Sequence, residues 1–431
     1  MLQSLNLGVV MKVLVVGSGG REHALTYALS LSPSVTEIHA IPGSDGMGRH
    51  TLCHKLDWHD HESIIIFCLR TEIDFVIIGP EDPLCDGLAD SLRQRGILVV
   101  GPGHDGARLE GSKKFAKEFM IEAKIPTAKH KIVRTVEETL SVATNFLPPF
   151  VFKADGLAAG KGVFICKTES ELKLAAQSLF EEKSLGKAGE TALLEQFTQG
   201  WELSYLIFTN GTDFESLPIA QDHKRLLNND EGPNTGGMGT VAPLKISKNL
   251  KISIDELIVK PTLLQLQKNG IFYRGIIFFG LMITKNGPSL LEYNCRLGDP
   301  ETQVILPLID GDLGIILKDL AQGKIRPLKY KSLTATCVVL AAPNYPLAPE
   351  KGVTIEGNIY HESPASYFIH SGTAKNINGK WTTNGGRVLC AVGVGSNLQE
   401  SIKAAYLQAA NVKWTRVQMR TDIGSKITSL N

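Results

Sequence analysis

Short apolar runs alternate with amphipathic, helix-forming stretches through the first hundred residues of the chain. Each apolar run has four or five residues, which is the length of a buried strand, and the stretches between them place apolar residues at helical spacing. This alternation predicts a parallel β-sheet flanked by helices. The predicted strands cover residues 13–16, 37–41, 75–78 and 97–100, and the predicted helices cover residues 22–30, 61–70 and 86–94.

The pattern changes after residue 111. An amphipathic segment, residues 111–123, has Ser112 as its expected N-cap and stops before Pro126, so we place the first domain boundary in this region. Beyond it, a mixed region is followed from about residue 331 by a β-rich one. The predicted strands are residues 150–153, 163–166, 191–195, 202–208, 335–341, 367–371 and 388–394 with a final short strand, the predicted helices are 169–179, 254–268 and 398–409, and residues 222–239 are a predicted polar loop.

Composition narrows the class of protein. A length of 431 residues suggests two to four domains, and 43% hydrophobic with 21% charged residues is typical of a soluble globular protein. A formal net charge of +1 gives no long-range attraction to nucleic acid or to an anionic membrane, so we expect neither as a partner. The longest apolar run, residues 275–283, is about half of a bilayer span. We expect no secretory signal, and translation could start at Met1 or Met11.

The cysteine and histidine patterns indicate no metal centre. Seven cysteines stand singly without a CxxC pair, which is typical of a reducing compartment, and we expect the protein in the cytoplasm. His54, His59 and His61 lie close in sequence but have no cysteine at metal-binding spacing, so they are interpreted as surface residues.

Residues 292–301, EYNCRLGDPE, carry the most informative pattern. They continue the second arm of a predicted hairpin, and alternate side chains of a strand share a face. Glu292, Asn294 and Arg296 therefore share one face, with Leu291, Tyr293 and Cys295 on the other. A carboxylate, an amide oxygen and a guanidinium together suit a hard cation and the phosphates it bridges. Taken alone, the segment is more typical of the solvated face of an edge strand.

Two glycine-rich segments follow predicted strands. Gly17, Gly19, Gly20 and Arg21 open a helix, where backbone N–H groups hold anions, but Glu22 breaks the dinucleotide pattern. A small phosphate site and a simple tight turn are equally good interpretations. The second segment, residues 153–162 (KADGLAAGKG), has Lys153 at the end of a strand and is not a Walker A loop. A flap between antiparallel strands fits it, closing over a triphosphate with lysine charge. The flap residues are Lys153, Gly156, Gly160, Lys161 and Gly162.

Two further polar segments suggest binding. Residues 195–202 (EQFTQGWE) connect two strands, where backbone groups could read an adenine and Glu202 could bind ribose hydroxyls; alone this pattern is weak. Residues 221–225 (QDHKR) and 232–239 (GPNTGGMG) lie in the long polar loop, which suits a mobile cover over an anionic substrate.

Taken together, these motifs resemble the ATP-grasp ligases and, more narrowly, the phosphoribosylamine–glycine ligase family. The resemblance extends from Met11 over nearly the whole chain and includes GSGGREHAL at 17–25, GPEDPL at 79–84, LEGSKKF at 109–115 and NGGRVL at 384–389. GPNTGGMG and NCRLGDPET are its most specific parts. It implies an N-terminal α/β domain (1–112), a two-lobed ATP-grasp module (113–330, with a flap lobe at about 126–198) and a small β-rich C-terminal domain (331–431), which makes the chain an α/β and α+β multidomain protein.

The resemblance also implies roles for individual residues. ATP and Mg²⁺ or Mn²⁺ would be used to join glycine to 5-phosphoribosylamine through a glycyl phosphate, in purine synthesis. Glu292 and Asn294 would bind the metal. The implied nucleotide contacts are Lys113, Lys153 and the flap for phosphates, Glu195, Gln196 and Phe197 for adenine, and Glu202 for ribose. The implied substrate-side residues are Asp222, Lys224, Arg225, Gly236, Gly237 and Arg296, with Gly17, Gly19, Gly20 and Arg21 on the ribosylamine side.

Some positions depart from the family pattern, and other functions stay open. Gln196 stands where a second Glu is usual, Trp201 replaces an acidic residue, and residues 342–346 lack the usual Gly-Gly, so we assign no site there. The alternatives are an ATP-grasp relative that activates bicarbonate or formate, and a non-catalytic nucleotide-binding regulator. We expect a single-function monomer that needs no covalent enzyme nucleophile.

Overall fold

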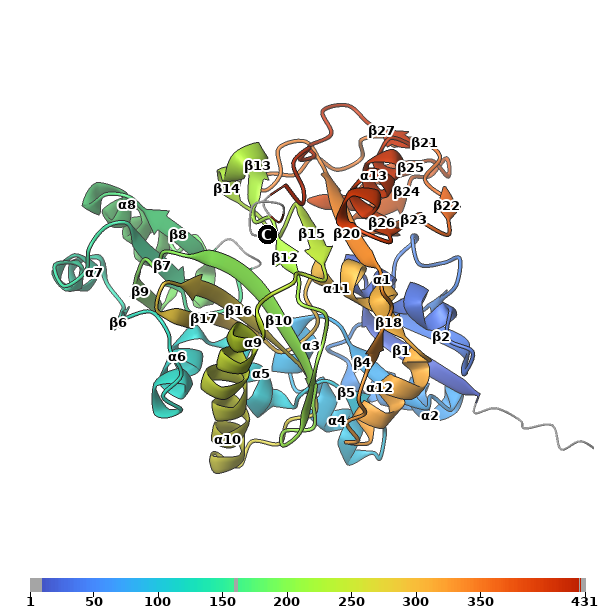
Figure 1. The fold of residues 1–431 in the computed structure, drawn as a ribbon, viewed down its shortest axis with the longest axis horizontal. Coiled ribbons are helices and arrows are strands. Elements are labelled where there is room, and N and C mark those ends of the chain that lie inside the picture. Colours follow the sequence, from blue (N-terminus) through green and yellow to red (C-terminus); the bar gives the residue numbers. More distant parts are fainter. Residues whose placement is uncertain (1–9, 159–161, 426, 428–431) are drawn as a thin grey trace, which may run out of the picture.

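The computed structural model describes residues 10–158, 162–425 and 427. It confirms the predicted fold class, because a parallel α/β region comes first, antiparallel sheets follow, and a β-rich region comes last. Figure 1 shows the first region in blue at the lower right, the last region in red above it, and a separate lobe in teal and green on the left. No helix in these described ranges is long and apolar enough to cross a membrane.

The first region is a five-stranded parallel sheet in the order β3-β2-β1-β4-β5. Its central strands are buried on both faces, which explains their unbroken apolar sequence. The predicted helix at 86–94 begins later than expected, because Gly87 takes a positive φ of 86° and separates two short helices. The elements are β1 Met11–Gly17, α1 Gly20–Ser30, β2 Val35–Pro42, β3 Leu52–Cys53, α2 His61–Thr71, β4 Phe75–Ile78, α3 Glu81–Cys85, α4 Leu88–Gln94, β5 Val99–Val100 and α5 His104–Gly111.

A second lobe has its own small core. Its four antiparallel strands run in the order β6-β9-β7-β8, and the apolar sides of α7 and α8 pack with Phe150, Phe152 and Leu194. The helix α6 leads into it, and Ser112 caps that helix as predicted by accepting a hydrogen bond from the Phe115 N–H. The elements are α6 Lys113–Glu122, β6 His130–Val133, α7 Val136–Ala143, β7 Phe150–Ala154, β8 Val163–Cys166, α8 Glu169–Phe180, η1 Gly186–Gly189 and β9 Ala192–Gln196.

A third sheet lies between the lobe and the first region (Figure 1), in the order β11-β10-β16-β17. Its strands pair antiparallel, and the predicted hairpin is β16 with β17. The helix predicted at 254–268 begins earlier, because α9, a π-helical turn and α10 follow one another without a break. The elements are β10 Trp201–Thr209, β11 Phe214–Ser216, α9 Lys248–Ile254, η3 Asp255–Val259, α10 Lys260–Lys268, β16 Gly275–Thr284 and β17 Gly287–Asn294.

The last sheet has six strands in the order β12-β15-β20-β26-β23-β22 and is covered by α13. Two of its strands, β12 and β15, come from the ends of the segment predicted as a polar loop. Within the segment, β13 and β14 form a hairpin that turns at Asn229 and Asp230, both with positive φ, and residues 235–238 remain a loop. Its lack of apolar alternation hid these strands. The segment contains β12 Gln221–Asp222, β13 Arg225–Leu227, η2 Asn228–Asp230, β14 Glu231–Asn234 and β15 Gly239–Ala242.

The remaining elements complete the last region and return to the first. The helix α12 packs against β5 of the parallel sheet, and Lys318 Nζ lies 2.8 Å from Asp74 Oδ1 there. These elements are α11 Glu301–Ile305, η4 Leu306–Leu308, β18 Ile309–Asp310, α12 Leu313–Ala321, β19 Lys329–Tyr330, β20 Thr334–Ala341, β21 Glu356–Gly357, β22 Glu362–Ser363, β23 Ser366–His370, β24 Thr373–Lys375, β25 Trp381–Thr383, β26 Arg387–Gly395, α13 Leu398–Ala409 and β27 Val412–Lys413.

Candidate active site

The strand β17 carries a bulge that sets the direction of its side chains. Glu292 pairs with Gly280, but Leu290 pairs with Leu281, so Leu291 is an extra residue. Leu290 and Tyr293 are therefore buried in the core, whereas Leu291 lines the same pocket as Glu292. The prediction that Leu291 lies on the face opposite Glu292 was wrong, because strict alternation along a strand does not allow for a bulge.

The pocket in front of β17 has a volume of about 330 Å³, including space open to solvent, and is lined by three strands of the third sheet, β10, β16 and β17, and by β12. Its lining combines apolar and charged side chains. Glu202 on β10, Asp222 on β12 and Glu292 on β17 bring three carboxylates to it, and Lys224 brings an ammonium. Asn294 is half-buried two residues after Glu292 on the same strand. The lining residues are Glu202, Leu203, Ser204, Asp222, Lys224, Phe278, Gly280, Leu281, Leu291 and Glu292.

A buried cluster of charges joins the flap lobe to this strand. Glu195 forms ion pairs with two lysines: Lys153 Nζ is 2.9 Å from its Oε2, and Lys117 Nζ is 3.3 Å from its Oε1. Lys153 Nζ also lies 3.5 Å from the Leu291 carbonyl oxygen. The flap lysine and the predicted metal-binding strand, 138 residues apart in sequence, therefore lie side by side.

Burial and charge act against each other in this cluster. Burial alone would lower the pKa of Lys153, but Glu195 and Glu292 outweigh it and leave that pKa raised. Burial lowers the pKa of Lys117 to about 8, with Glu195 opposing the shift. The pKa of Glu195 is lowered, because Lys153 and Lys117 outweigh its burial. The cluster thus holds two ammonium groups on one carboxylate.

Lys113 and the flap glycines lie at the start of the same lobe. Lys113 Nζ donates to the Gly156 carbonyl oxygen at 3.3 Å. Burial lowers the pKa of Lys113, and Glu292 opposes this effect. Gly156 and Gly162 have no room for a side chain, since a Cβ would come within 2.8 Å of Ala188 Cα or of Ala158 Cβ. The predicted flap residues Gly160 and Lys161 lie outside the described residues.

The segment predicted to contact a nucleotide base is only partly available. Glu195 is in the central strand of its sheet and its carboxylate is occupied by the two lysines. The Gln196 side chain bonds to the Leu147 backbone at 3.1 and 2.9 Å. Phe197 is partly exposed, and Glu202 lines the pocket.

Arg296 lies in a second charged cluster, apart from the pocket lining. Its NH2 is 2.6 Å from Glu110 Oε1 and its Nε is 3.3 Å from Glu81 Oε2. Burial raises the pKa of Glu110 to about 7, with Arg296 opposing the shift. Burial would also raise the pKa of Glu81, but Arg296 and Arg21 bring it down to about 2. One guanidinium is thus shared by two carboxylates.

The predicted cluster at 222–225 is brought together only in part. Lys224 Nζ is 2.9 Å from Asp222 Oδ2, and the pKa of Lys224 is raised because Asp222 and Glu301 outweigh its burial. Ser204 donates to Glu301 at 2.9 Å. Burial, followed by the nearby Asp222, raises the pKa of Glu301. Arg225 points elsewhere, since its NH1 donates to Gly232 of its own hairpin at 2.8 Å.

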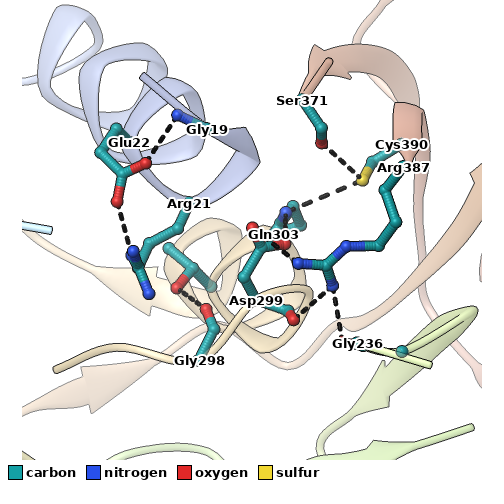
Figure 2. A network of polar contacts seen from close by, with 12 residues as sticks. Gly19, Arg21, Glu22, Gly236, Gly298, Asp299, Gln303, Ser371, Arg387 and Cys390 are labelled. Atoms are coloured by element: carbon teal, nitrogen blue, oxygen red, sulfur yellow. Dashed lines mark hydrogen bonds and ion pairs between the residues drawn. The ribbon is translucent and has the colours of Figure 1, made fainter. Parts of the chain in front are cut away.

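The first glycine turn is bonded mainly to its own helix (Figure 2). The Gly19 N–H donates to Glu22 Oε2 at 2.7 Å, and Arg21 Nε is 2.5 Å from Glu22 Oε1. Gly17 has a φ of 127°, and a Cβ there would collide with the Glu22 side chain. These contacts agree with the tight-turn interpretation. The turn nevertheless faces Asp299, which lies next to Arg387 of the last region in Figure 2.

Family profiles agree with this geometry over almost all of the chain. The phosphoribosylglycinamide synthetase N domain matches residues 11–110, its ATP-grasp (A) domain matches 111–302, and its C domain matches 335–426. The chain belongs to the phosphoribosylglycinamide synthetase family. The predicted resemblance is therefore confirmed.

Individual relatives support this membership. A phosphoribosylamine–glycine ligase of Caldanaerobacter subterraneus is 39% identical over 418 residues, covering 96% of this chain and 100% of the relative. The human trifunctional purine biosynthetic protein adenosine-3 is 41% identical over 424 residues, and the match spans 96% of this chain but 42% of the human protein. The crystal structure of a Thermotoga maritima phosphoribosylamine–glycine ligase aligns with a TM-score of 0.83 at 36% identity, covering 96% and 100% of the two chains.

The side chains of this synthetase-family chain fit a metal–nucleotide pair. Among the described residues, no group of three or more His, Cys, Asp or Glu side chains could by itself hold a metal. Glu292 and Asn294 supply two oxygen ligands, the type that Mg²⁺ prefers, and Mg²⁺ commonly completes its shell with phosphate oxygens and water. Glu292 also faces Lys113 and Lys153, whose charge suits those phosphates.

Several residues of the synthetase site were missed from sequence. Lys117 follows Lys113 by one helical turn, so spacing could have suggested it. Glu301 lies inside the EYNCRLGDPE motif and could have been included with it. Glu81 and Glu110 lie in the family motifs GPEDPL and LEGSKKF, but nothing in those motifs paired them with Arg296, because only the fold brings them together. The missed residues are Glu81, Glu110, Lys117, Asp299, Glu301, Tyr345 and Arg387.

Proposed function

We propose that this protein uses ATP to join glycine to 5-phosphoribosylamine, giving glycinamide ribonucleotide, ADP and phosphate in purine biosynthesis. The observation that carries the proposal is the convergence of the flap and β17, with Lys153 Nζ 3.5 Å from the Leu291 carbonyl beside Glu292. A lysine-rich lobe facing an acidic strand suits a triphosphate held with a metal ion. The family membership supplies the substrates.

The proposed reaction has two steps. The glycine carboxylate oxygen attacks the γ-phosphorus, the bond to the β-phosphate oxygen breaks, and ADP leaves, which gives glycyl phosphate. The ribosylamine nitrogen then attacks the carbonyl carbon, phosphate leaves, and the nitrogen loses a proton as the amide forms. The protein contributes position and charge rather than a covalent nucleophile. Closure of the flap would protect glycyl phosphate from water.

On the nucleotide side, Lys113 and Lys153 would hold phosphates, and we propose the flap residues Gly156, Gly160, Lys161 and Gly162 as further nucleotide contacts. Because the Glu195 carboxylate is occupied by Lys153 and Lys117, adenine would be read by backbone groups of Gln196 and Phe197. Glu202 would bind the ribose. Glu292 and Asn294 would hold Mg²⁺ or Mn²⁺, which when bound neutralises phosphate charge.

On the substrate side, Lys224 would stabilise the acyl phosphate, and Asp222 would hold Lys224 at 2.9 Å. Arg296 would act from the Glu81 and Glu110 cluster, and Gly236 and Gly237 would cover the substrate. The turn of Gly17, Gly19, Gly20 and Arg21 would face the ribosylamine. Arg225 has the weakest support, because its guanidinium is bonded to its own hairpin. We propose the same division of the chain at residues 112 and 330, and a monomer in the cytoplasm.

A substrate-omission assay tests the function. Purified protein is supplied with ATP, Mg²⁺ and 5-phosphoribosylamine generated in the assay, and ADP release is followed with glycine, bicarbonate or formate. We expect ADP release and glycinamide ribonucleotide, detected by mass spectrometry, with glycine alone. Turnover with bicarbonate or formate, or nucleotide binding without turnover, would reject the proposal.

A further inference from the structure

The backbone of Gly236 is held on both sides by side chains of the last region. Its N–H donates to Tyr345 Oη at 2.9 Å, and its carbonyl accepts from Arg387 NH1 at 2.7 Å. Figure 2 shows Arg387 reaching Gly236 and Asp299 together. The partners are 109 and 151 residues away in sequence. The N–H groups of Thr235 and Met238, on either side, donate to the carbonyl oxygens of Lys224 and His223 at 2.8 Å. The ends of the turn are therefore held by its own segment, and Gly236 at its tip is held by the last region.

Both holding residues are themselves fixed. The Tyr345 ring covers Gly386, where a Cβ would come within 2.6 Å of ring carbon Cε2. Gln418 Nε2 donates to the Tyr345 carbonyl at 3.1 Å and to the neighbouring Ala342 carbonyl at 2.7 Å. Arg387 NH1 also donates to the Asp299 carbonyl at 2.6 Å, and its NH2 is 3.2 Å from Asp299 Oδ2.

The Gly236 turn packs closely against one residue of the pocket lining, Asp222. Gly237 has a φ of 112°, which favours glycine, and a Cβ there would lie 2.7 Å from Asp222 Oδ1 and 2.6 Å from Pro300 Cδ. The backbone of the turn thus packs directly against the carboxylate that holds Lys224. A shift of the turn would change the space around Asp222 without touching the cluster of Lys153 and Glu195.

We propose that Tyr345 and Arg387 are positioning residues, which hold the Gly236 turn so that Asp222 and Lys224 are set for the substrate. This inference rests on the proposed function. It assigns a role to residues 342–346, for which the sequence suggested none, and it gives the last region a task in the reaction. Because both residues act through the turn, replacing either one should raise the KM for glycine or ribosylamine and leave the affinity for ATP unchanged.

The test compares Tyr345→Phe with Tyr360→Phe, a matched variant. Tyr360 lies in the same region, and its hydroxyl accepts from Trp381 Nε1 at 3.1 Å, far from the turn in sequence. Tyr345→Phe removes one hydrogen bond to the Gly236 N–H and should raise the KM for glycine or ribosylamine about three- to tenfold. Tyr360→Phe should leave both KM values unchanged. ATP affinity, measured by calorimetry, should stay within about twofold in either variant.

A second variant keeps the test decisive if one hydrogen bond proves too weak. Arg387→Met removes all three contacts and should raise the same KM by about ten- to a hundredfold, with partial recovery in Arg387→Lys. Amide hydrogen exchange, followed by mass spectrometry on peptides covering residues 232–240, should be faster in Tyr345→Phe and in Arg387→Met than in wild type. Hydrogen exchange reports on the turn even if the wild type does not ligate glycine. Failure of the proposed function can therefore be distinguished from failure of this inference.

Three results would overturn the inference. Unchanged exchange in Tyr345→Phe and Arg387→Met would show that neither residue holds the turn. An increase in KM for Arg387→Met without faster exchange of the peptides covering residues 232–240 would place Arg387 in direct contact with substrate. Equal losses for substrate and nucleotide, together with a lower melting temperature, would make both residues structural.

Discussion

Two charged clusters of this protein mirror each other. In the flap lobe, one carboxylate, Glu195, is shared by Lys117 and Lys153. Beside the parallel sheet, one guanidinium, Arg296, is shared by Glu81 and Glu110. The first cluster places two lysines on one carboxylate and the second places two carboxylates on one guanidinium. The strand β17 with the two residues after it lies between them, with Glu292 toward the first cluster and Arg296 in the second.

The difference shows that local charge, not net charge, prepares this site. The whole chain carries a formal charge of only +1, yet charged side chains gather in two buried clusters where solvent screens them little. In the proposed reaction the lysines of the flap-lobe cluster would bind the triphosphate, and the carboxylates around Arg296 would attract the amine. Each predicted change below removes one member of this arrangement.

The largest effect is expected from Glu292→Ala. It removes the carboxylate that faces the lysine cluster and one of two proposed metal ligands, but little packing. Turnover should fall at least about a thousandfold while the melting temperature stays near that of wild type. Glu215→Ala, on the edge strand of the same sheet, is the control and should keep full activity. Near-normal turnover at saturating Mg²⁺ would refute the assignment of Glu292.

Breaking the centre of each cluster should reduce stability, unequally. Glu195→Gln leaves two buried ammonium groups without their carboxylate and should lower the free energy of unfolding by about 3–5 kcal/mol. Arg296→Met leaves two carboxylates, but Glu110 already has a pKa of about 7 and can take up a proton. The free energy of unfolding lost in Arg296→Met should therefore be smaller at pH 6 than at pH 8. Urea unfolding measures both, and an equal loss for Arg296→Met at the two pH values would contradict this account.

The pKa of Glu110 predicts a pH dependence of stability in the wild type. That pKa is raised from 4.5 to about 7, so the folded protein binds the proton more tightly than the unfolded chain. The contribution to stability is present below pH 4.5 and is lost as the pH rises through 7. Compared with Glu110→Gln, wild type should lose up to about 1.4 kcal/mol per pH unit across this window, measured by urea unfolding. A stability difference that stays flat from pH 4.5 to 7 would disprove the shift.

The smallest effect is expected from Lys117→Met. Glu195 keeps Lys153 at 2.9 Å, so its charge remains compensated, and the cost of burying Lys117 disappears. The free energy of unfolding should fall by about 1–2 kcal/mol, less than in Glu195→Gln. If both variants lose the same stability, Glu195 depends on Lys117 as much as on Lys153, and the cluster is not shared as described.

The elements with clear periodicity were predictable, and those without it were not. The parallel strands and the cap at Ser112 follow from apolar runs and a local hydrogen bond. The hairpin of β13 and β14 was missed, because its residues are polar and its pairing depends on a turn in which Asn229 and Asp230 both have positive φ. The bulge at Leu291 was missed for a similar reason, since one extra residue leaves no trace in the composition.

The same division holds for the candidate site. The sequence pointed to Lys153, Glu202, Asp222 and Glu292, each within a motif, and the structure brings these residues around one pocket and its neighbouring cluster. It did not point to Glu81, Glu110 or Tyr345, whose partners lie more than a hundred residues away. Arg225 was assigned by its position in a motif, and its guanidinium bonds to Gly232 of its own hairpin.

The sequence by itself determined the family, the order of the elements and the residue types that can meet a nucleotide, because these depend on local spacing and composition. Tertiary structure alone decided which charges share a partner and which turn is held by a distant tyrosine and arginine. Those pairings require chain segments from different regions to meet in a buried space. There the energy of a charge depends on its neighbours in three dimensions and not on its neighbours in sequence.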